Sequence, residues 1–82
     1  NLKVYPNPIV NEAYIDFEVE NNTQVTIEVY DLSGRKVISN NVGTYQEGLH
    51  KASFSVEGLK SGTYIVKVQA GEKSSTAKVM VY

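Results

Sequence analysis

The chain has 82 residues, a formal net charge of −1, a charged fraction of 21% and a hydrophobic fraction of 41%, a composition that suits one small folded domain rather than a disordered tail. It has no basic excess of the kind that nucleic-acid binding needs, and no cysteine for a disulfide or a thiolate metal site. No apolar stretch reaches the roughly 20 residues of a transmembrane helix.

Apolar and polar residues alternate with a period of two through most of the chain, which predicts β-strands. The clearest alternation lies at 12–20, where apolar side chains share one face and acidic side chains the other, as in a half-buried strand with a solvated face. No segment has the period or the capping residues of a helix. In chain order, the expected strands are 2–5, 12–20, 24–31, 35–39, 50–56, 63–70 and 75–82.

Turn-forming residues separate these strands. Pro6-Asn7-Pro8 cannot continue a strand because each proline lacks a backbone donor. The sequence from Asp31 to Gly34 is typical of a hairpin, with Asp early and Gly late. The longest expected loop is 40–46. About seven short strands with a turn every 8–12 residues predict an all-β fold, an immunoglobulin-like antiparallel β-sandwich that forms a single domain over 1–82.

The side chains that could support catalysis are poorly placed for it. His50 is the only histidine, and Ser53 and Ser55 point away from it on the same expected strand. The acidic residues of 12–20 lie along one strand face rather than across a cleft. Asp31 and Ser33 fit a hairpin turn better than a calcium loop. We therefore expect no enzyme activity, no metal and no cofactor.

Outward-facing tyrosines leave one binding function open. Tyr14 and Tyr30 have outward parity on successive expected strands, and cross-strand aromatic pairs can stack on a sugar. The alternative reading of the chain is therefore an accessory carbohydrate-binding or spacer module of a secreted hydrolase.

Three segments follow one another in an order that resembles a known family. They are Val-Tyr-Pro-Asn-Pro at 4–8, Val-Tyr-Asp-Leu-Ser-Gly-Arg-Lys-Val at 29–37 and Leu-Lys-Ser-Gly-Thr-Tyr-Ile-Val-Lys-Val at 59–68. Together they resemble the type A C-terminal sorting domain of the type IX secretion system of Bacteroidetes, over the whole chain. The first residue is Asn1 rather than Met, and we expect the domain to be the end of a longer secreted protein.

The resemblance implies a non-catalytic secretion signal. A cargo protein would reach the periplasm by its own signal peptide, and the outer-membrane translocon would then recognise the folded domain. A sortase-like protease at the surface would remove it and leave the cargo on the cell surface or outside the cell. The expected partners are thus the translocon and that protease, with no nucleic acid and no transmembrane segment, and the domain is expected to be monomeric.

The candidate recognition residues are the motif positions and the end of the last strand. Pro6 and Pro8 are expected to form a rigid start to the sandwich, and Arg35 to pair with Asp31 or with a receptor carboxylate. The family usually closes with a basic strand, whereas 75–82 contains only one lysine. We expect that strand to be the handle for a partner, with an open edge and two apolar side chains facing outward. The full set is Pro6, Asn7, Pro8, Asp31, Gly34, Arg35, Gly62, Tyr64, Lys78, Met80 and Tyr82.

Overall fold

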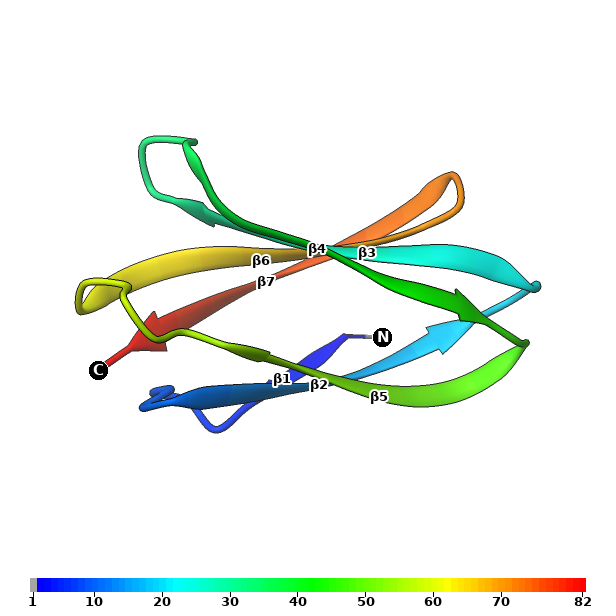
Figure 1. Cartoon of the computed structure of the whole chain (residues 1–82), viewed down its shortest axis with the longest axis horizontal. Coiled ribbons are helices and arrows are strands. Elements are labelled where there is room, and N and C mark those ends of the chain that lie inside the picture. The colour runs from blue at the N-terminus through cyan, green and yellow to red at the C-terminus, as the bar shows by residue number, and fades with distance from the viewer. Residues whose placement is uncertain (1) are drawn as a thin grey trace.

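The structure is a computed structural model that describes residues 2–82, and Asn1, the first residue of the predicted domain, lies outside the described residues. The chain forms a sandwich of seven β-strands, which confirms the predicted all-β fold (Figure 1). Within residues 2–82 no helix has the length and apolar character to cross a membrane. The strands are β1 (Lys3–Tyr5), β2 (Glu12–Val19), β3 (Thr23–Asp31), β4 (Lys36–Tyr45), β5 (Gly48–Ser55), β6 (Gly62–Ala70) and β7 (Lys73–Val81).

The strands divide into a three-stranded sheet of order β1-β2-β5 and a four-stranded sheet of order β4-β3-β6-β7. Every pair of neighbouring strands is antiparallel. The chain crosses between the sheets after β2, after β4 and after β5, so that strands distant in sequence become neighbours. This arrangement confirms the predicted immunoglobulin-like sandwich.

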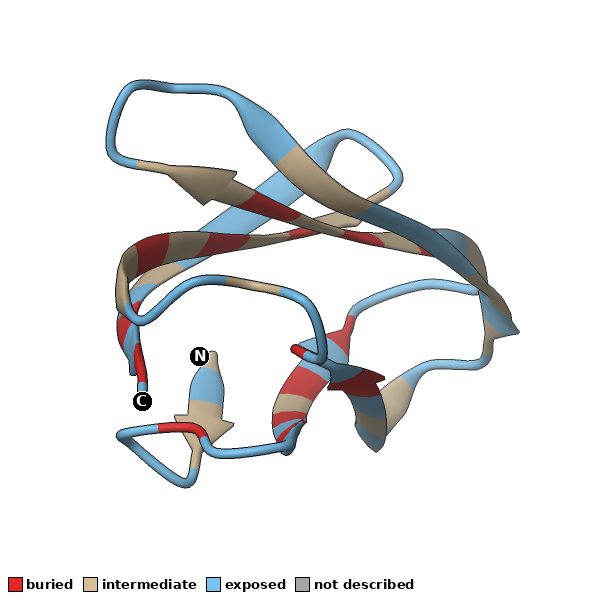
Figure 2. Ribbon diagram, turned by 60° about the vertical axis from the view of Figure 1, so that its left-hand side comes forward, coloured by how far each residue is buried: buried red, intermediate tan, exposed pale blue. Residues whose placement is uncertain are grey.

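The apolar faces of the two sheets pack against each other (Figure 2). Alternate residues of each strand point inward, as the period of two predicts. Among the described residues no polar or charged side chain is buried, so the sandwich is held together mainly by removal of apolar surface from water. The buried set is Ile9, Ala13, Ile15, Phe17, Val19, Val25, Ile27, Val29, Phe54, Val56, Tyr64, Val66, Val68, Val79 and Val81.

The loop predicted at 40–46 is wrong, because β4 continues through it as far as Tyr45. Val42 of β4 has no partner on β3, which makes the strand bulge at this point, as it does again at Val37. Gly43 has φ of +106°, and its N–H donates to the side chain of Asn41 over 3.0 Å. Asn and Gly here form a β-bulge within an edge strand, and the same residue types are also typical of turns.

The sequence suggested that the segment with Pro6 and Pro8 forms the start of the sandwich. The structure shows that this prediction is wrong. The segment connects β1 to β2, because Lys3–Tyr5 already pairs with Tyr14–Asp16 as an edge strand. The first strand of the sandwich, β1, therefore precedes the two prolines.

Candidate functional site

The three sequence motifs come together at one end of the sandwich. Asp31 at the end of β3 lies opposite Tyr64 on β6, and Tyr64 lies opposite Val79 on β7. The segment after Pro8 runs beside the end of β7, through a bridge between Ile9 and Val81. We call this part, formed by residues 5–12, 30–37, 56–64 and 77–82, the motif end; it lies on the left in Figure 1.

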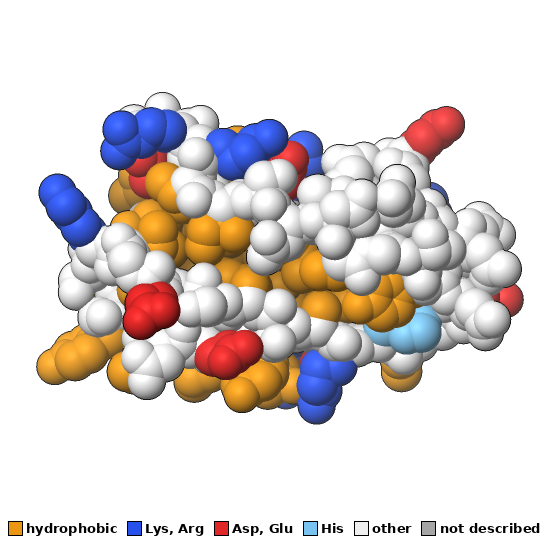
Figure 3. All heavy atoms as spheres, viewed as in Figure 1, with side chains coloured by type: hydrophobic (Ala, Val, Ile, Leu, Met, Phe, Trp, Pro, Cys, Tyr) orange, Lys and Arg blue, Asp and Glu red, His pale blue; other side chains and the backbone are white. Residues whose placement is uncertain are grey.

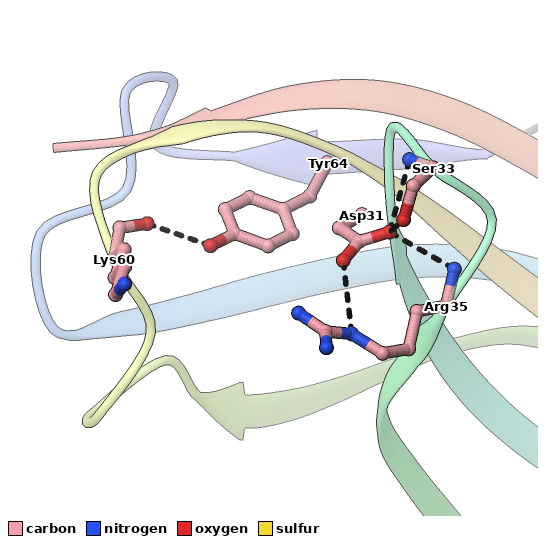
Figure 4. A network of polar contacts seen from close by, with 5 residues as sticks. All are labelled: Asp31, Ser33, Arg35, Lys60 and Tyr64. Carbon is pink, nitrogen blue, oxygen red and sulfur yellow. Dashed lines mark hydrogen bonds and ion pairs between the residues drawn. The ribbon is translucent and has the colours of Figure 1, made fainter.

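Asp31 organises the hairpin between β3 and β4 (Figure 4). Its Oδ1 accepts hydrogen bonds from the Ser33 N–H at 3.0 Å, the Ser33 hydroxyl at 2.7 Å and the Arg35 N–H at 2.9 Å. Its Oδ2 pairs with Arg35 Nε at 3.3 Å. Gly34 has φ of +92°, a conformation that suits glycine. The carboxylate is thus occupied by donors of its own turn, and Arg35 has Asp31 as its partner within the domain.

These donors lower the pKa of Asp31 below its usual value, the Ser33 hydroxyl most and the Arg35 N–H next. Because the folded-state pKa is the lower one, the carboxylate stabilises the fold above its unfolded pKa, about 3.9. That stabilisation is lost as the pH falls through the folded-state pKa.

We therefore expect Asp31→Asn to lower the melting temperature by several degrees at pH 6 and to differ little from wild type near pH 2. Thermal unfolding across this range measures the difference. The matched control is Glu57→Gln, since Glu57 is an exposed carboxylate at the same end with no ion pair among the described residues. A constant gap between Asp31→Asn and wild type across the range would contradict the expectation.

Tyr64 fills the corner where the chain enters β6. Its side chain is 7% exposed, and its hydroxyl donates a 2.7 Å hydrogen bond to the carbonyl of Lys60 (Figure 4). A tyrosine at this position that bonds to the backbone just upstream is the tyrosine corner of immunoglobulin-like sandwiches. Gly62, between the two residues, has φ of +157°. Tyr64 thus serves the fold rather than offering its ring to a partner.

We expect Tyr64→Phe to lower the free energy of unfolding by about 1–2 kcal/mol, because the Lys60 carbonyl loses its donor while the ring stays packed. In a domain of this size that corresponds to a fall of roughly 5–10 °C in melting temperature. Calorimetry of the variant measures it, with Tyr82→Phe as the control because Tyr82 is 81% exposed. An unchanged melting temperature for Tyr64→Phe would show that the hydrogen bond contributes nothing.

The segment after the first motif clamps the end of the last strand. Ile9 donates its N–H to the Met80 carbonyl over 2.7 Å and accepts from the Tyr82 N–H over 2.8 Å. The side chain of Asn7 accepts from the Met80 N–H over 3.0 Å. The prediction of an open edge at the end of β7 is therefore wrong for Met80 and Tyr82, whose backbone is already paired. The edge remains uncovered only further back, towards Lys78.

Sequence reasoning missed Ile9, which is 0% exposed. It follows two prolines and an asparagine in a segment that lacks alternation, so the pattern assigned it to a turn. The one available signal is a large aliphatic residue in an otherwise polar, proline-rich connection.

The surface of the motif end carries exposed apolar side chains and charged side chains of both signs, including the carboxylates Glu12 and Glu57. Six large hydrophobic side chains are exposed among the described residues. Four of them lie here, namely Val10, Leu32, Met80 and Tyr82. Exposed cations stand at the same end, namely Arg35, Lys36, Lys60 and Lys78. Figure 3 shows hydrophobic, basic and acidic side chains together over its left part. Exposed aliphatic and aromatic groups among charged side chains form a surface suited to contact with another protein.

Tyr14 and Tyr30 do not form the predicted pair, because they lie in different sheets. Tyr14 stacks on Tyr5 of β1, with ring centroids 5.9 Å apart, and the Tyr30 hydroxyl donates to Glu28. The chain changes sheets between β2 and β3, which an alternation pattern does not reveal. The prediction that Tyr14 and Tyr30 together form the aromatic platform of a carbohydrate-binding module is therefore wrong.

His50 lies at the end of β5, half-buried against Phe17 and Tyr45, with ring centroids 5.9 Å and 4.8 Å away. Its neighbours Ser53 and Ser55 are exposed on the opposite face of the strand, as expected. Among residues 2–82 there is no group of three or more His, Cys, Asp or Glu side chains placed to hold a metal ion.

Comparison with protein families finds a match over residues 3–82 to the family described as "Secretion system C-terminal sorting domain". The match covers all three motifs and every strand of the sandwich. No curated protein matches the chain.

Proposed function

Since the chain belongs to the family of secretion system C-terminal sorting domains, the sorting signals of type IX secretion, we propose that its motif end is the surface that the outer-membrane translocon recognises. Membership implies export through the outer membrane to the cell surface or the extracellular space. In the proposed sequence of events the cargo reaches the periplasm by its own signal peptide, and a sortase-like protease removes the domain after export. The domain itself performs no chemistry.

One observation carries this proposal, namely the convergence of the three motifs at one end. Residues at 7, 31, 64 and 80 come from four connections and strand ends that meet only in the folded chain. Asp31 and Tyr64 hold their own turns, so their contribution is to shape that end. Met80 and Tyr82 are 53% and 81% exposed there, which leaves them available to a partner.

Recognition of this surface requires a folded domain. Asn7 and Met80 are 73 positions apart in sequence, and only the completed sandwich brings them into contact. An unfolded chain would offer the same residues without their arrangement. The proposal thus explains why a secretion signal has a buried core and a tyrosine corner.

The test is export of a reporter enzyme that carries an N-terminal signal peptide and this domain at its C-terminus, in a bacterium with an active type IX system. We expect the reporter outside the cell, and in the periplasm when the domain is absent. Val66→Asp should also retain it, because Val66 is 0% exposed and a carboxylate there prevents folding. The matched control, Lys67→Ser, changes the neighbouring position on the outer face. Equal export from a strain without the translocon would refute the proposal.

Removal of the domain has its own readout. We expect the mass of the exported reporter to lack residues 2–82 in a strain with the surface protease and to include them in a strain without it. A released reporter that keeps the domain in both strains would refute removal and leave recognition intact.

A further inference from the structure

One edge of β2 is only partly covered. On one side β2 pairs with β5 along its whole length, Glu12–Val19. On the other side β1 pairs only with Tyr14–Asp16 and is much shorter than β2 (Figure 1). Phe17–Val19 therefore have no strand partner on that side among the described residues. Backbone groups on an uncovered strand edge are ready to pair with another strand.

The facing part of β7 lacks cover as well. Its inward positions alternate, and Val81 and Val79 are buried while Ala77 is half-buried. Ser75 and Lys73 have the same parity and are exposed. The alternation of burial thus fails in the half of β7 that lies away from the motif end, where β1 does not reach.

A groove of about 440 Å³ lies between these two uncovered segments. Its floor is apolar and includes Phe17, Val19 and Val68, whose side chains belong to the core. Leu2, the first described residue, also lines it. The groove is thus continuous with the start of β1.

The walls of the groove are acidic. Glu18, Glu20 and Glu72 line it, together with a single lysine, Lys73, which forms an ion pair with Glu20. The exposed cations of the motif end lie at the other end of the sandwich, away from the groove. An occupant of the groove would therefore combine apolar side chains for the floor with cationic side chains for the walls.

We propose that the polypeptide upstream of Leu2, which joins the cargo to the domain, extends β1 along Glu18 and Val19 and closes this groove. The inference rests on the proposed function, because it takes the cargo to precede the domain. Alternate added residues bond their backbone to β2, and the added strand covers part of the exposed half of β7. The docked residues stay with the domain as a strand, so a protease that cuts the linker acts further upstream.

The register of β1 defines the chemistry of the linker. Lys3 lies opposite Asp16, so the second residue upstream of Leu2 comes opposite Val19 and the third opposite Glu20. Val4 and Leu2 pack against the core, and alternation then points the second upstream residue into the groove and the third outward. The groove thus selects an apolar residue at the second position and Lys or Arg at the third.

Hydrogen exchange tests this docking in the protein that carries its cargo. The Glu18 amide should exchange about tenfold more slowly in the full-length protein than in the 82-residue chain. Alternate residues of β2, beginning with the bond between Asn11 and Val56, face β5, which leaves the Glu18 N–H at the open edge for the added strand to protect. The amides of β7 near Met80, already bonded to the N-terminal segment, should not change and serve as the internal control. Equal exchange at Glu18 in the two proteins would overturn the proposal.

Two extensions of the isolated chain test which upstream residues point into the groove and which point outward. Lys-Val-Lys-Val placed before Asn1 puts valine at the second position upstream of Leu2 and lysine at the third, whereas Val-Lys-Val-Lys has the same composition in the opposite phase. We expect the first to raise the melting temperature by roughly 5 °C and the second to leave it unchanged. Equal melting temperatures would contradict the inferred register.

A second copy of the chain is the competing occupant, and sedimentation distinguishes it. We expect the 82-residue chain to remain a monomer at micromolar concentration. A dimer that Lys-Val-Lys-Val dissociates would assign the groove to a second copy and overturn the linker proposal. None of these measurements involves secretion, so failure of docking and failure of export are separate results.

Discussion

Replacing Ile9 by alanine is expected to destabilise the domain by about 3 kcal/mol and to abolish most export of a fused reporter. Ile9 is 0% exposed, and its backbone holds both Met80 and Tyr82. The smaller side chain leaves a cavity where the first motif meets the end of β7. The free energy of unfolding of a domain of this size is small, so the melting temperature should fall by more than 10 °C.

The neighbouring residue provides the control. Val10 is 59% exposed, so Val10→Ala removes similar apolar volume from the surface and should leave the melting temperature within about 2 °C of wild type. Calorimetry and reporter export are measured on the same two variants. If Ile9→Ala melts like Val10→Ala, the buried side chain of Ile9 does not contribute to folding.

Replacing Met80 and Tyr82 together by serine is expected to reduce export at least tenfold while the melting temperature changes by no more than about 2 °C. Both side chains point away from the core, and the bonds to Asn7 and Ile9 are made by the backbone of β7, which serine preserves. A few exposed apolar and aromatic residues commonly carry most of the affinity of a protein interface.

Leu49→Ser is the matched control, since Leu49 is 80% exposed on β5 and outside the motif end. It should be exported like wild type. Normal export of the Met80→Ser, Tyr82→Ser variant would remove these side chains from the proposed recognition surface. Deletion of the last three residues would be a weaker test, because it also removes Val81, which is 4% exposed and bridges to Ile9.

The two results separate folding from recognition at one place in the molecule. Ile9 stabilises the end of β7 through its buried side chain, whereas Met80 and Tyr82 present exposed side chains to a partner. A secretion signal built in this way presents its last strand in one geometry only when the first motif has docked on it. Incompletely folded chains would then lack the surface that the translocon reads.

Local pattern was sufficient to predict the strands and the faces they bury. Side chains in a strand alternate between two faces, so the placement of Ile15, Phe17 and Val19 in the core follows from their spacing alone. Asp31 and Gly34 predicted their hairpin because turn chemistry is set by residues that are near one another in sequence. The family resemblance rested on three such local segments, and the match over residues 3–82 confirmed it.

Only the tertiary structure decided which strands are neighbours. The change of sheet after β2 separates Tyr14 from Tyr30, and the bulge at Val42 turns an expected loop into part of β4. The bonds from Ile9 to β7 join segments more than 70 positions apart, and the groove beside Phe17 lies where β1 pairs only with Tyr14–Asp16 and does not cover the rest of β2. Alternation records which face a residue takes within its own strand. The pairing of strands depends on backbone hydrogen bonds and packing between distant segments, which leave no periodic signal in a single sequence.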